Sequence, residues 1–306
     1  MPRFSVVVPC HNASRTLPET LASLAAQTFP DWEALCVDDG STDATRAILE
    51  AEARRDPRVR PLRNPGKGPS AARNFGARLA QGQVLAFCDA DDLWTPDKLA
   101  ALDAAFADRA LDGAYARIGF FDGAPDHVST VSTPPEGRLA LAHLMGENPV
   151  CTMSNIAVRR CAFDAAGPFR EDMVHNEDLE WLIRLVGTGH RVEALDAVHV
   201  LYRKSPGGLS ADLTAMARGR ALAMASAARF GARPGRRAEA VHLRYLARRA
   251  LRLEDGGLTA LRLSLRGLAQ SPRGFLSPLR RGGPTLLASL AAPVMPRALR
   301  RALFAR

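Results

Sequence analysis

Three carboxylates lie close together in the segment Asp89-Ala90-Asp91-Asp92, directly behind the apolar run at residues 84–88. A short apolar run bounded by polar residues is typical of a buried strand, so the acidic side chains should emerge where that strand ends. Carboxylate oxygens are the ligands that Mg²⁺ and Mn²⁺ prefer. The segment therefore predicts a divalent-metal site, while a solvated turn or helix cap is the alternative that the acidic run alone leaves open.

Strand and helix patterns alternate over the first 106 residues and would position these acids. Predicted strands cover 4–8, 34–37, 59–62 and 84–88; predicted helices start near Leu17 and cover 45–53, 70–80 and 96–106, the last with Thr95 as cap and Pro96 at its first position. This series predicts an α/β fold with a mostly parallel sheet flanked by helices. Ligands of such sheets bind beyond the carboxyl ends of the strands.

Two further polar clusters should reach that same edge. The segment Pro9-Cys10-His11-Asn12 follows the first predicted strand, and the segment at 38–43, Asp-Asp-Gly-Ser-Thr-Asp, follows the second. The glycine pattern at 66–71 fits a dinucleotide-binding loop poorly, because it follows the third strand and holds Pro69 where a pyrophosphate would approach. A nucleotide beside so many acids would need a cation.

The pattern changes along the second half of the chain. Predicted elements are a strand at 113–121, a helix at 139–145, a strand at 154–159 and a helix at 178–186; from about residue 211 the chain reads as wholly helical. We place a domain boundary near Ser210, with an α/β domain at 1–210 and a basic helical region at 211–306. The basic charge is concentrated there: residues 229–306 carry 17 arginines and three acidic residues.

Composition excludes several classes of protein. The 306 residues are 47% hydrophobic, enough to bury a large core. No apolar run approaches the roughly 18 residues of a membrane-spanning helix, and the amino terminus does not read as a secretory signal. Five cysteines without a CxxC spacing fit reduced, mostly buried thiols. We therefore expect a cytoplasmic protein.

Six segments, taken in order and spacing, resemble the landmarks of the family 2 glycosyltransferases of the GT-A fold. They are 5–12, 27–29 (Gln-Thr-Phe), 37–43, 70–74 (Ser-Ala-Ala-Arg-Asn), 87–92 and Glu177-Asp178, and the match covers about the first 210 residues. The resemblance implies an inverting transferase that moves a sugar from a nucleotide diphosphate donor, UDP being the expected nucleotide, to an acceptor hydroxyl with Mg²⁺ or Mn²⁺ present. Synthesis of a cell-surface polysaccharide or a lipid-linked glycan is the expected setting.

The resemblance also implies roles for single residues. The nucleotide-binding residues would be Pro9 and His11 at the base, Asp39 as its hydrogen-bond partner, Arg73 beside the nucleotide and Asp89 at the ribose. Asp91 would hold the metal, and Asp89 and His199 are further candidate ligands.

Asp178 would be the catalytic base that takes the proton of the acceptor hydroxyl. The alternative is that Glu177 and Asp178 are acids at a helix amino terminus, where the helix dipole stabilises them. In the family, a His follows the Tyr-Arg pair closely, but here Tyr202-Arg203-Lys204 leads to Ser205. Arg203 and Lys204 would then neutralise diphosphate charge themselves, with Glu177 in the same region. His199 would otherwise be a packed strand residue.

Two other classes of function remain open. A metal-dependent nucleotidyltransferase would share the scaffold, and a non-catalytic protein would use its arginine-rich tail to bind membrane or nucleic acid. Few aromatic residues are available to stack on bases, which disfavours nucleic acid. The tail pairs leucine stripes at 243–253, 258–268 and 286–295 with arginines, a combination that predicts peripheral association with an anionic membrane surface. Packing of those stripes within the protein is the alternative.

Overall fold

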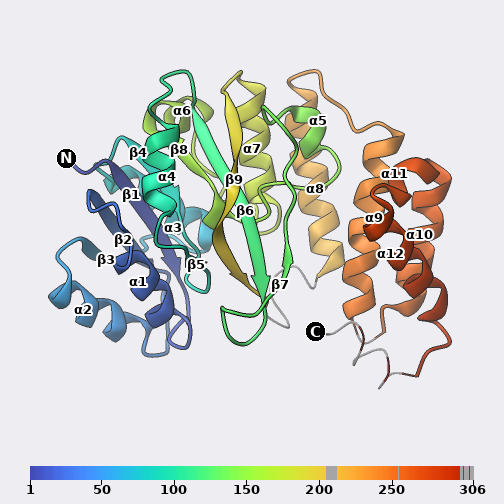
Figure 1. The fold of residues 1–306 in the computed structure, drawn as a ribbon, viewed down its shortest axis with the longest axis horizontal. Coiled ribbons are helices and arrows are strands. Elements are labelled where there is room, and N and C mark those ends of the chain that lie inside the picture. Colours follow the sequence, from blue (N-terminus) through green and yellow to red (C-terminus); the bar gives the residue numbers. More distant parts are fainter. Residues whose placement is uncertain (205–211, 254, 297–298, 300–302, 304–306) are drawn as a thin grey trace. The chain divides into compact units, whose positions relative to one another are not determined.

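The computed structural model describes residues 1–204, 212–253, 255–296, 299 and 303 (Figure 1). The chain divides into two compact units. The sheet unit comprises Met1–Leu139 and Pro149–Lys204, and the helical unit comprises Ala140–Asn148 and Ser205–Arg306. The boundary expected near Ser210 lies outside the described residues. The segment Ala140–Asn148 belongs to the helical unit, although it precedes the expected boundary by many residues.

The described residues of the sheet unit form one nine-stranded sheet with the order β3-β2-β1-β4-β8-β6-β9-β5, and β7 pairs with β6. The strands are β1 (Phe4–Cys10), β2 (Trp32–Asp38), β3 (Val59–Arg63), β4 (Val84–Phe87), β5 (Leu93–Trp94), β6 (Gly113–Phe121), β7 (Val128–Val131), β8 (Ala157–Arg159) and β9 (Val192–Arg203). Strands β1 to β4, β6 and β9 run in one direction, and β5, β7 and β8 run against them. The predicted α/β fold with a mostly parallel sheet is confirmed.

The order of the parallel strands creates a switch point. From β1 the chain moves to β2 and β3 on one side and then returns to β4 on the other. The register sets Cys10 beside Asp38, and Val7 beside Phe87. The chain segments after β1, β2 and β4 therefore leave the sheet at one edge, where open α/β sheets bind their ligands.

Helices of the sheet unit are α1 (Leu17–Ala25), α2 (Thr45–Arg55), α3 (Pro69–Leu79), α4 (Lys98–Ala105), α6 (Arg160–Ala166) and α7 (Glu177–Gly187). Pro69 occupies the first turn of α3, as predicted. Proline is tolerated there because the N–H groups of a helix's first turn have no acceptor within the helix. Helix α3 lies close on the sheet: a Cβ on Gly76 would stand 2.5 Å from Val7 Cγ1. The predicted start of α4 at Pro96 is wrong. Helix α4 begins at Lys98, and Thr95 Oγ1 donates to Asp97 Oδ1 at 2.6 Å.

The strand predicted at 154–159 is shorter than expected. Met153–Asn155 forms a 3₁₀ turn, and β8 covers only Ala157–Arg159. Asn155 explains the difference, because its side chain donates to Ala116 O at 2.8 Å and accepts from Ala116 N at 3.0 Å. The Asn155 side chain thus pairs with β6 in place of strand backbone. The residues before it can therefore turn toward residues 89–92 after β4, which we call the acidic loop.

The helical unit contains α5 (Leu141–Leu144), α8 (Leu213–Ala228), α9 (Arg236–Arg252), α10 (Gly257–Gln270), α11 (Pro272–Leu276) and α12 (Leu279–Ala291). Along α9, the predicted stripe of Leu243, Leu246 and Ala250 is buried. Arg244 is buried beside it and donates to Phe275 O at 3.1 Å, which ties α9 to α11. Within the described part of the chain, no helix has the length and apolar character required to cross a bilayer.

Candidate active site

Asp39 is held rigidly at the carboxyl end of β2. Its backbone N–H donates to Cys10 O at 2.8 Å, which couples it to the end of β1. Its carboxylate accepts one hydrogen bond from Asn64 Nδ2 at 2.6 Å and one from the Gly68 N–H at 2.8 Å. Each carboxylate oxygen can accept two hydrogen bonds, so both retain capacity for a ligand donor. Asn64 was not foreseen from the sequence.

His11 and Asn12 tie the loop after β1 to the loop after β2. His11 Nδ1 lies 3.0 Å from Asp39 O, and the His11 side chain is exposed. Asn12 adopts φ of 48° in the left-handed region, which Asn tolerates better than most residues. Its Oδ1 accepts from the Thr42 N–H at 2.8 Å. Pro9 lies half-buried in β1 next to these loops. The predicted base-contact residues therefore do come together.

Asp92 anchors the acidic loop after β4. Its side chain is buried and accepts from Ser154 Oγ at 2.5 Å and from the Arg203 N–H at 3.2 Å. Ser154 Oγ in turn accepts from the Asp89 N–H at 2.9 Å. Thr152 Oγ1 donates to Asp89 Oδ2 at 3.0 Å. The Ser154 hydroxyl fixes the backbone of the loop and the Thr152 hydroxyl holds the Asp89 side chain, while Asp89 and Asp91 are left partly open to solvent.

Arg73 joins two acids from distant parts of the sequence. From α3, its Nη2 donates to Asp89 Oδ1 at 2.7 Å and its Nη1 to Glu177 Oε1 at 3.1 Å. The guanidinium is buried, which lowers the pKa of Arg73, but the two carboxylates outweigh burial and raise that pKa above its ordinary value. Arg73 is therefore a permanently charged link between the loop after β4 and the start of α7.

The acidic loop carries more negative charge than its surroundings balance. Burial, and then the charge of Asp89, raise the pKa of Asp91 to about 6, although Arg203 opposes the shift. Burial, Asp91 and Asp89 raise the pKa of Asp92 well above its ordinary value. A divalent cation beside Asp91 would relieve this repulsion, so the donor set fits Mg²⁺ or Mn²⁺.

The described residues supply few protein ligands for such an ion. Nowhere in them do three or more His, Cys, Asp or Glu side chains gather as a metal cage. Mg²⁺ is commonly held by one or two carboxylates together with substrate phosphates. Asp91, with Asp89 near it, matches that kind of site better than an all-protein cage.

Glu177 and Asp178 begin helix α7. Asn176 precedes them at φ of 59° and turns the chain into the helix. Burial and then Asp178 raise the pKa of Glu177 to about 7, and Arg73 opposes the shift. Asp178 itself is half-exposed. Its predicted role as base stays a prediction, and the first turn of α7 also satisfies the helix-dipole alternative.

His199 and Arg203 lie on β9 with different surroundings. His199 is buried, and its Nδ1 lies 3.1 Å from Thr95 Oγ1 and 3.4 Å from Asp97 Oδ1. No hydrogen bond or ion pair within the described residues links His199 to Asp89 or Asp91. Arg203 Nε donates to Asp91 O at 3.1 Å, so Arg203 does lie at the acidic loop, and half-exposed Lys204 follows it.

The sequence profile of the family described as "Glycosyl transferase family 2" matches residues 5–167, just over half of the chain. The chain belongs to this family. The match runs from β1 to the end of α6 and includes the loops that carry Asp39, Asp89 and Asp91.

Other members and neighbours of this glycosyltransferase family resemble the chain to different extents. The uncharacterized glycosyltransferase EpsJ of Bacillus subtilis is 29% identical over 220 residues, which cover 69% of this chain and 63% of EpsJ. An Escherichia coli relative, WfgD, described as a UDP-Glc:alpha-D-GlcNAc-diphosphoundecaprenol beta-1,3-glucosyltransferase, is 39% identical over 97 residues, 31% of this chain and 37% of WfgD. This chain thus spans less than two thirds of either relative.

A solved structure with a similar fold is the mannosyltransferase PcManGT from Pyrobaculum calidifontis in complex with GDP-Man and Mn²⁺. It superposes with a TM-score of 0.61 at 21% identity, over 96% of this chain and 86% of PcManGT. At that identity the similarity establishes the GT-A-like fold and nothing about the donor.

Several residues of the candidate site carried no signal that could be recognised in the sequence. Thr152 and Ser154 reach the acidic loop only through the turn that Asn155 makes possible. Lys98 is buried, donates to Ser154 O at 3.0 Å and lies over the Trp94 ring. Burial lowers the pKa of Lys98 to about 7. These contacts join segments far apart in the chain, which spacing within one segment cannot predict.

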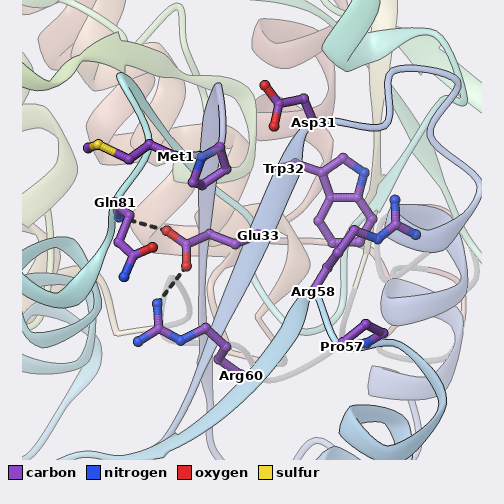
Figure 2. Close-up of a pocket in the computed structure, with 9 residues that line it drawn as sticks. Met1, Asp31, Trp32, Glu33, Pro57, Arg58, Arg60 and Gln81 are labelled. Carbon is purple, nitrogen blue, oxygen red and sulfur yellow. Dashed lines mark hydrogen bonds and ion pairs between the residues drawn. The ribbon is translucent and has the colours of Figure 1, made fainter.

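A separate hollow of about 590 Å³ lies at the opposite, amino-terminal edge of β1 to β3 (Figure 2). Glu33 occupies its centre and accepts from Arg60 Nη1 at 2.5 Å and the Gln81 N–H at 2.6 Å. Arg58 lies over the Trp32 ring. Glu33 is satisfied by the Arg60 and Gln81 donors, and the hollow lies at the ends of the strands opposite to Asp39 and Asp89, so we assign it no role in the transferase site.

The raised pKa of Glu177 predicts a pH-dependent stability. Because its folded-state pKa of about 7 exceeds the ordinary value of 4.5, the folded chain binds the proton more tightly, and ionisation costs stability as pH rises from about 4.5 to 7. Glu177→Gln removes that ionisation, so the free energy of unfolding of the native protein relative to the variant should fall across this window, by about 1.4 kcal/mol per pKa unit. Urea denaturation at several pH values measures it. Parallel pH profiles for the two proteins would show that Glu177 is not the titrating group.

Proposed function

We propose that this chain catalyses inverting transfer of a sugar from a nucleotide diphosphate donor, with UDP as the nucleotide, to a hydroxyl of a surface or lipid-linked glycan. The observation that carries the proposal is the convergence of Asp39, Asp89 and Asp91 at the ends of β2 and β4, on either side of β1. Burial and the charge of Asp89 raise the pKa of Asp91, a repulsion that a bound divalent cation would relieve. The donor and acceptor named for WfgD, UDP-Glc and a diphosphoundecaprenol-linked sugar, support the choice of UDP and of a lipid-linked acceptor.

In the nucleotide-binding part of the site, the Asp39 carboxylate would accept a hydrogen bond from the base. Asn64 and Gly68 hold the carboxylate in one orientation, so little side-chain entropy is lost when a base N–H approaches. For uracil, the donor is the N3–H. Pro9 and His11 would line the same pocket, and Asp89, held by Arg73 and Thr152, would accept from the ribose hydroxyls.

The diphosphate half would lie over Asp91, Arg203 and Lys204. Asp91 would hold Mg²⁺ or Mn²⁺, which when bound neutralises phosphate charge and makes the nucleotide diphosphate a better leaving group. Arg203 is already oriented by the Asp91 carbonyl and by Glu19, whose Oε2 accepts from Arg203 Nη2 at 2.6 Å. The Mn²⁺ in the PcManGT complex is consistent with this choice of cofactor.

The transfer step needs a base on the face of the sugar opposite the leaving group. The acceptor oxygen forms the new bond to the anomeric carbon, the bond to the diphosphate oxygen breaks, and the acceptor proton passes to the Asp178 carboxylate. Asp178 lies half-exposed beside Glu177, which Arg73 holds to Asp89. The linked ion pairs of Glu177, Arg73 and Asp89 would set the distance between the catalytic base Asp178 and the donor site.

A donor screen tests the proposal. Purified protein is incubated with UDP-, GDP- and dTDP-sugars, with Mn²⁺ and with EDTA, and nucleotide products are separated. We expect UDP release that requires the metal. A parallel incubation contains a nucleoside triphosphate and a sugar phosphate, and pyrophosphate release there would instead identify a nucleotidyltransferase. No release from any nucleotide-sugar would contradict catalysis by this chain.

A further inference from the structure

Among its described residues, the helical unit exposes an apolar face on α10 and α12. Six large apolar residues on or beside these helices are each at least half exposed to solvent: Leu258, Leu265, Leu279, Leu287, Leu290 and Val294. We call this set the leucine face. The other sides of the same helices are packed: Ala260, Ser264 and Gly267 on α10, and Thr285 and Ser289 on α12, are buried.

The leucine face is continuous across both helices. Ser264 Oγ donates to Ser289 Oγ at 2.9 Å, and Ala260 and Ala292 share one apolar cluster, so α10 and α12 pack antiparallel. Leu265 and Leu290 each follow one of these serines by one residue, a rotation of about 100° around the helix. In an antiparallel pair this rotation turns both leucines to the same side. At a rotation of about 100° per residue, Leu258 and Leu287 also fall on that side of the helix pair.

The chain that forms this face is strongly basic after exposed Asp255, which precedes Leu258. No Asp or Glu occurs after Asp255, whereas nine arginines do. Arg262 lies one turn from both Leu258 and Leu265 on the same side of α10, and it is exposed, as is its neighbour Arg266. Single exposed leucines are common on soluble proteins, but a contiguous apolar face flanked by exposed arginines is not.

We propose that the leucine face docks on an anionic lipid bilayer, with Arg262 and Arg266 against the acidic headgroups. Apolar burial at the headgroup boundary and attraction to acidic lipids act together in such surfaces. The predicted contribution of the α9 stripe to membrane binding is wrong, because Leu243, Leu246 and Ala250 are buried in the helical unit. The arginines at 297, 300, 301 and 306 that the prediction also used lie outside the described residues.

Flotation with liposomes tests the proposal on the full chain. The variant Leu258→Gln/Leu265→Gln/Leu287→Gln/Leu290→Gln changes only exposed side chains, and Leu79→Gln/Leu222→Gln changes two exposed leucines elsewhere as a matched control. The native chain and the control should float with vesicles containing phosphatidylglycerol but not with phosphatidylcholine alone. The fourfold variant should bind at least about tenfold more weakly, and Arg262→Gln/Arg266→Gln should reduce both binding and its sensitivity to about 0.5 M salt.

Three results would overturn the proposal. The native chain could fail to float with the anionic vesicles, or the fourfold variant could float as well as the native chain. Light scattering supplies the third: self-association of the native chain that the fourfold variant abolishes would make the leucine face an interface between copies. Unchanged thermal melting of the variants shows that each result reports on the surface and not on unfolding.

Discussion

Asp178→Asn should lower kcat by about 10²–10⁴ and leave the affinity for the nucleotide-sugar donor within a few fold. The expected loss is that of a general base, since Asn keeps the size and polarity of Asp but cannot take the acceptor proton. Donor affinity should survive because Asp178 lies at the start of α7, whereas Asp39 and Asp91 follow β2 and β4. Steady-state kinetics with saturating acceptor, together with calorimetric titration of the donor, separate the two quantities.

Asp164→Asn is a matched control for that substitution, because Asp164 is an exposed aspartate on the neighbouring helix α6. It should leave kcat unchanged. Near-native turnover in Asp178→Asn would assign Asp178 to the helix-dipole role at α7. A loss of donor affinity as large as the loss of turnover would instead place Asp178 in donor binding.

Asp91→Asn should lower kcat/KM by about 10²–10³ and abolish the response of activity to Mn²⁺. The neutral side chain lacks the charge that holds a divalent ion, and neutralisation of phosphate charge by such an ion is worth several kcal/mol in the transition state. The variant should stay folded, because removing a carboxylate whose pKa is raised to about 6 relieves repulsion with Asp89. Activity measured across a Mn²⁺ titration tests this.

The control for Asp91→Asn is Asp122→Asn, an exposed aspartate in the loop after β6. Its Mn²⁺ response should match that of the native chain. If Asp91→Asn kept the native metal response, the ion would be held elsewhere. If neither protein responded to metal while both were active, Arg203 and Lys204 would be the groups that neutralise the diphosphate.

The parallel half of the fold could be predicted because its signals are local. Strands β1, β2 and β4 each contain a short apolar run, and Pro69 marks the start of α3. In the half formed by β5 to β9, the strand predicted at 113–121 is confirmed as β6, but β5, β7 and β9 were not predicted. The strands of this half pair over long sequence distances and partly through side chains, as Asn155 pairs with Ala116. The short strands β5 and β7 and the helix α6 had no periodic pattern long enough to recognise.

The candidate site shows the same division between residues with local sequence signals and residues placed by long-range contacts. Asp39, Asp89 and Asp91 lie in polar clusters whose place after predicted strands was read from the sequence, and the family resemblance supplied their proposed roles. Their supports were not: Thr152 and Ser154 contact the acidic loop from more than 60 positions away along the chain, and Asn64 contacts Asp39 from 25 away. The contacts of His199 with Thr95 and Asp97 likewise arise from the pairing of β5 with β9, which the sequence did not reveal.

Calorimetric titration of UDP into the native chain and into Asp39→Ala, each with Mn²⁺ and with EDTA, tests the nucleotide site most directly. The native chain should bind UDP in Mn²⁺ and much more weakly in EDTA. Asp39→Ala should bind about tenfold to a hundredfold more weakly in Mn²⁺, the worth of one hydrogen bond to a charged group. Equal affinity of the two proteins for UDP, or binding that EDTA does not change, would contradict a metal-assisted nucleotide site between β2 and β4.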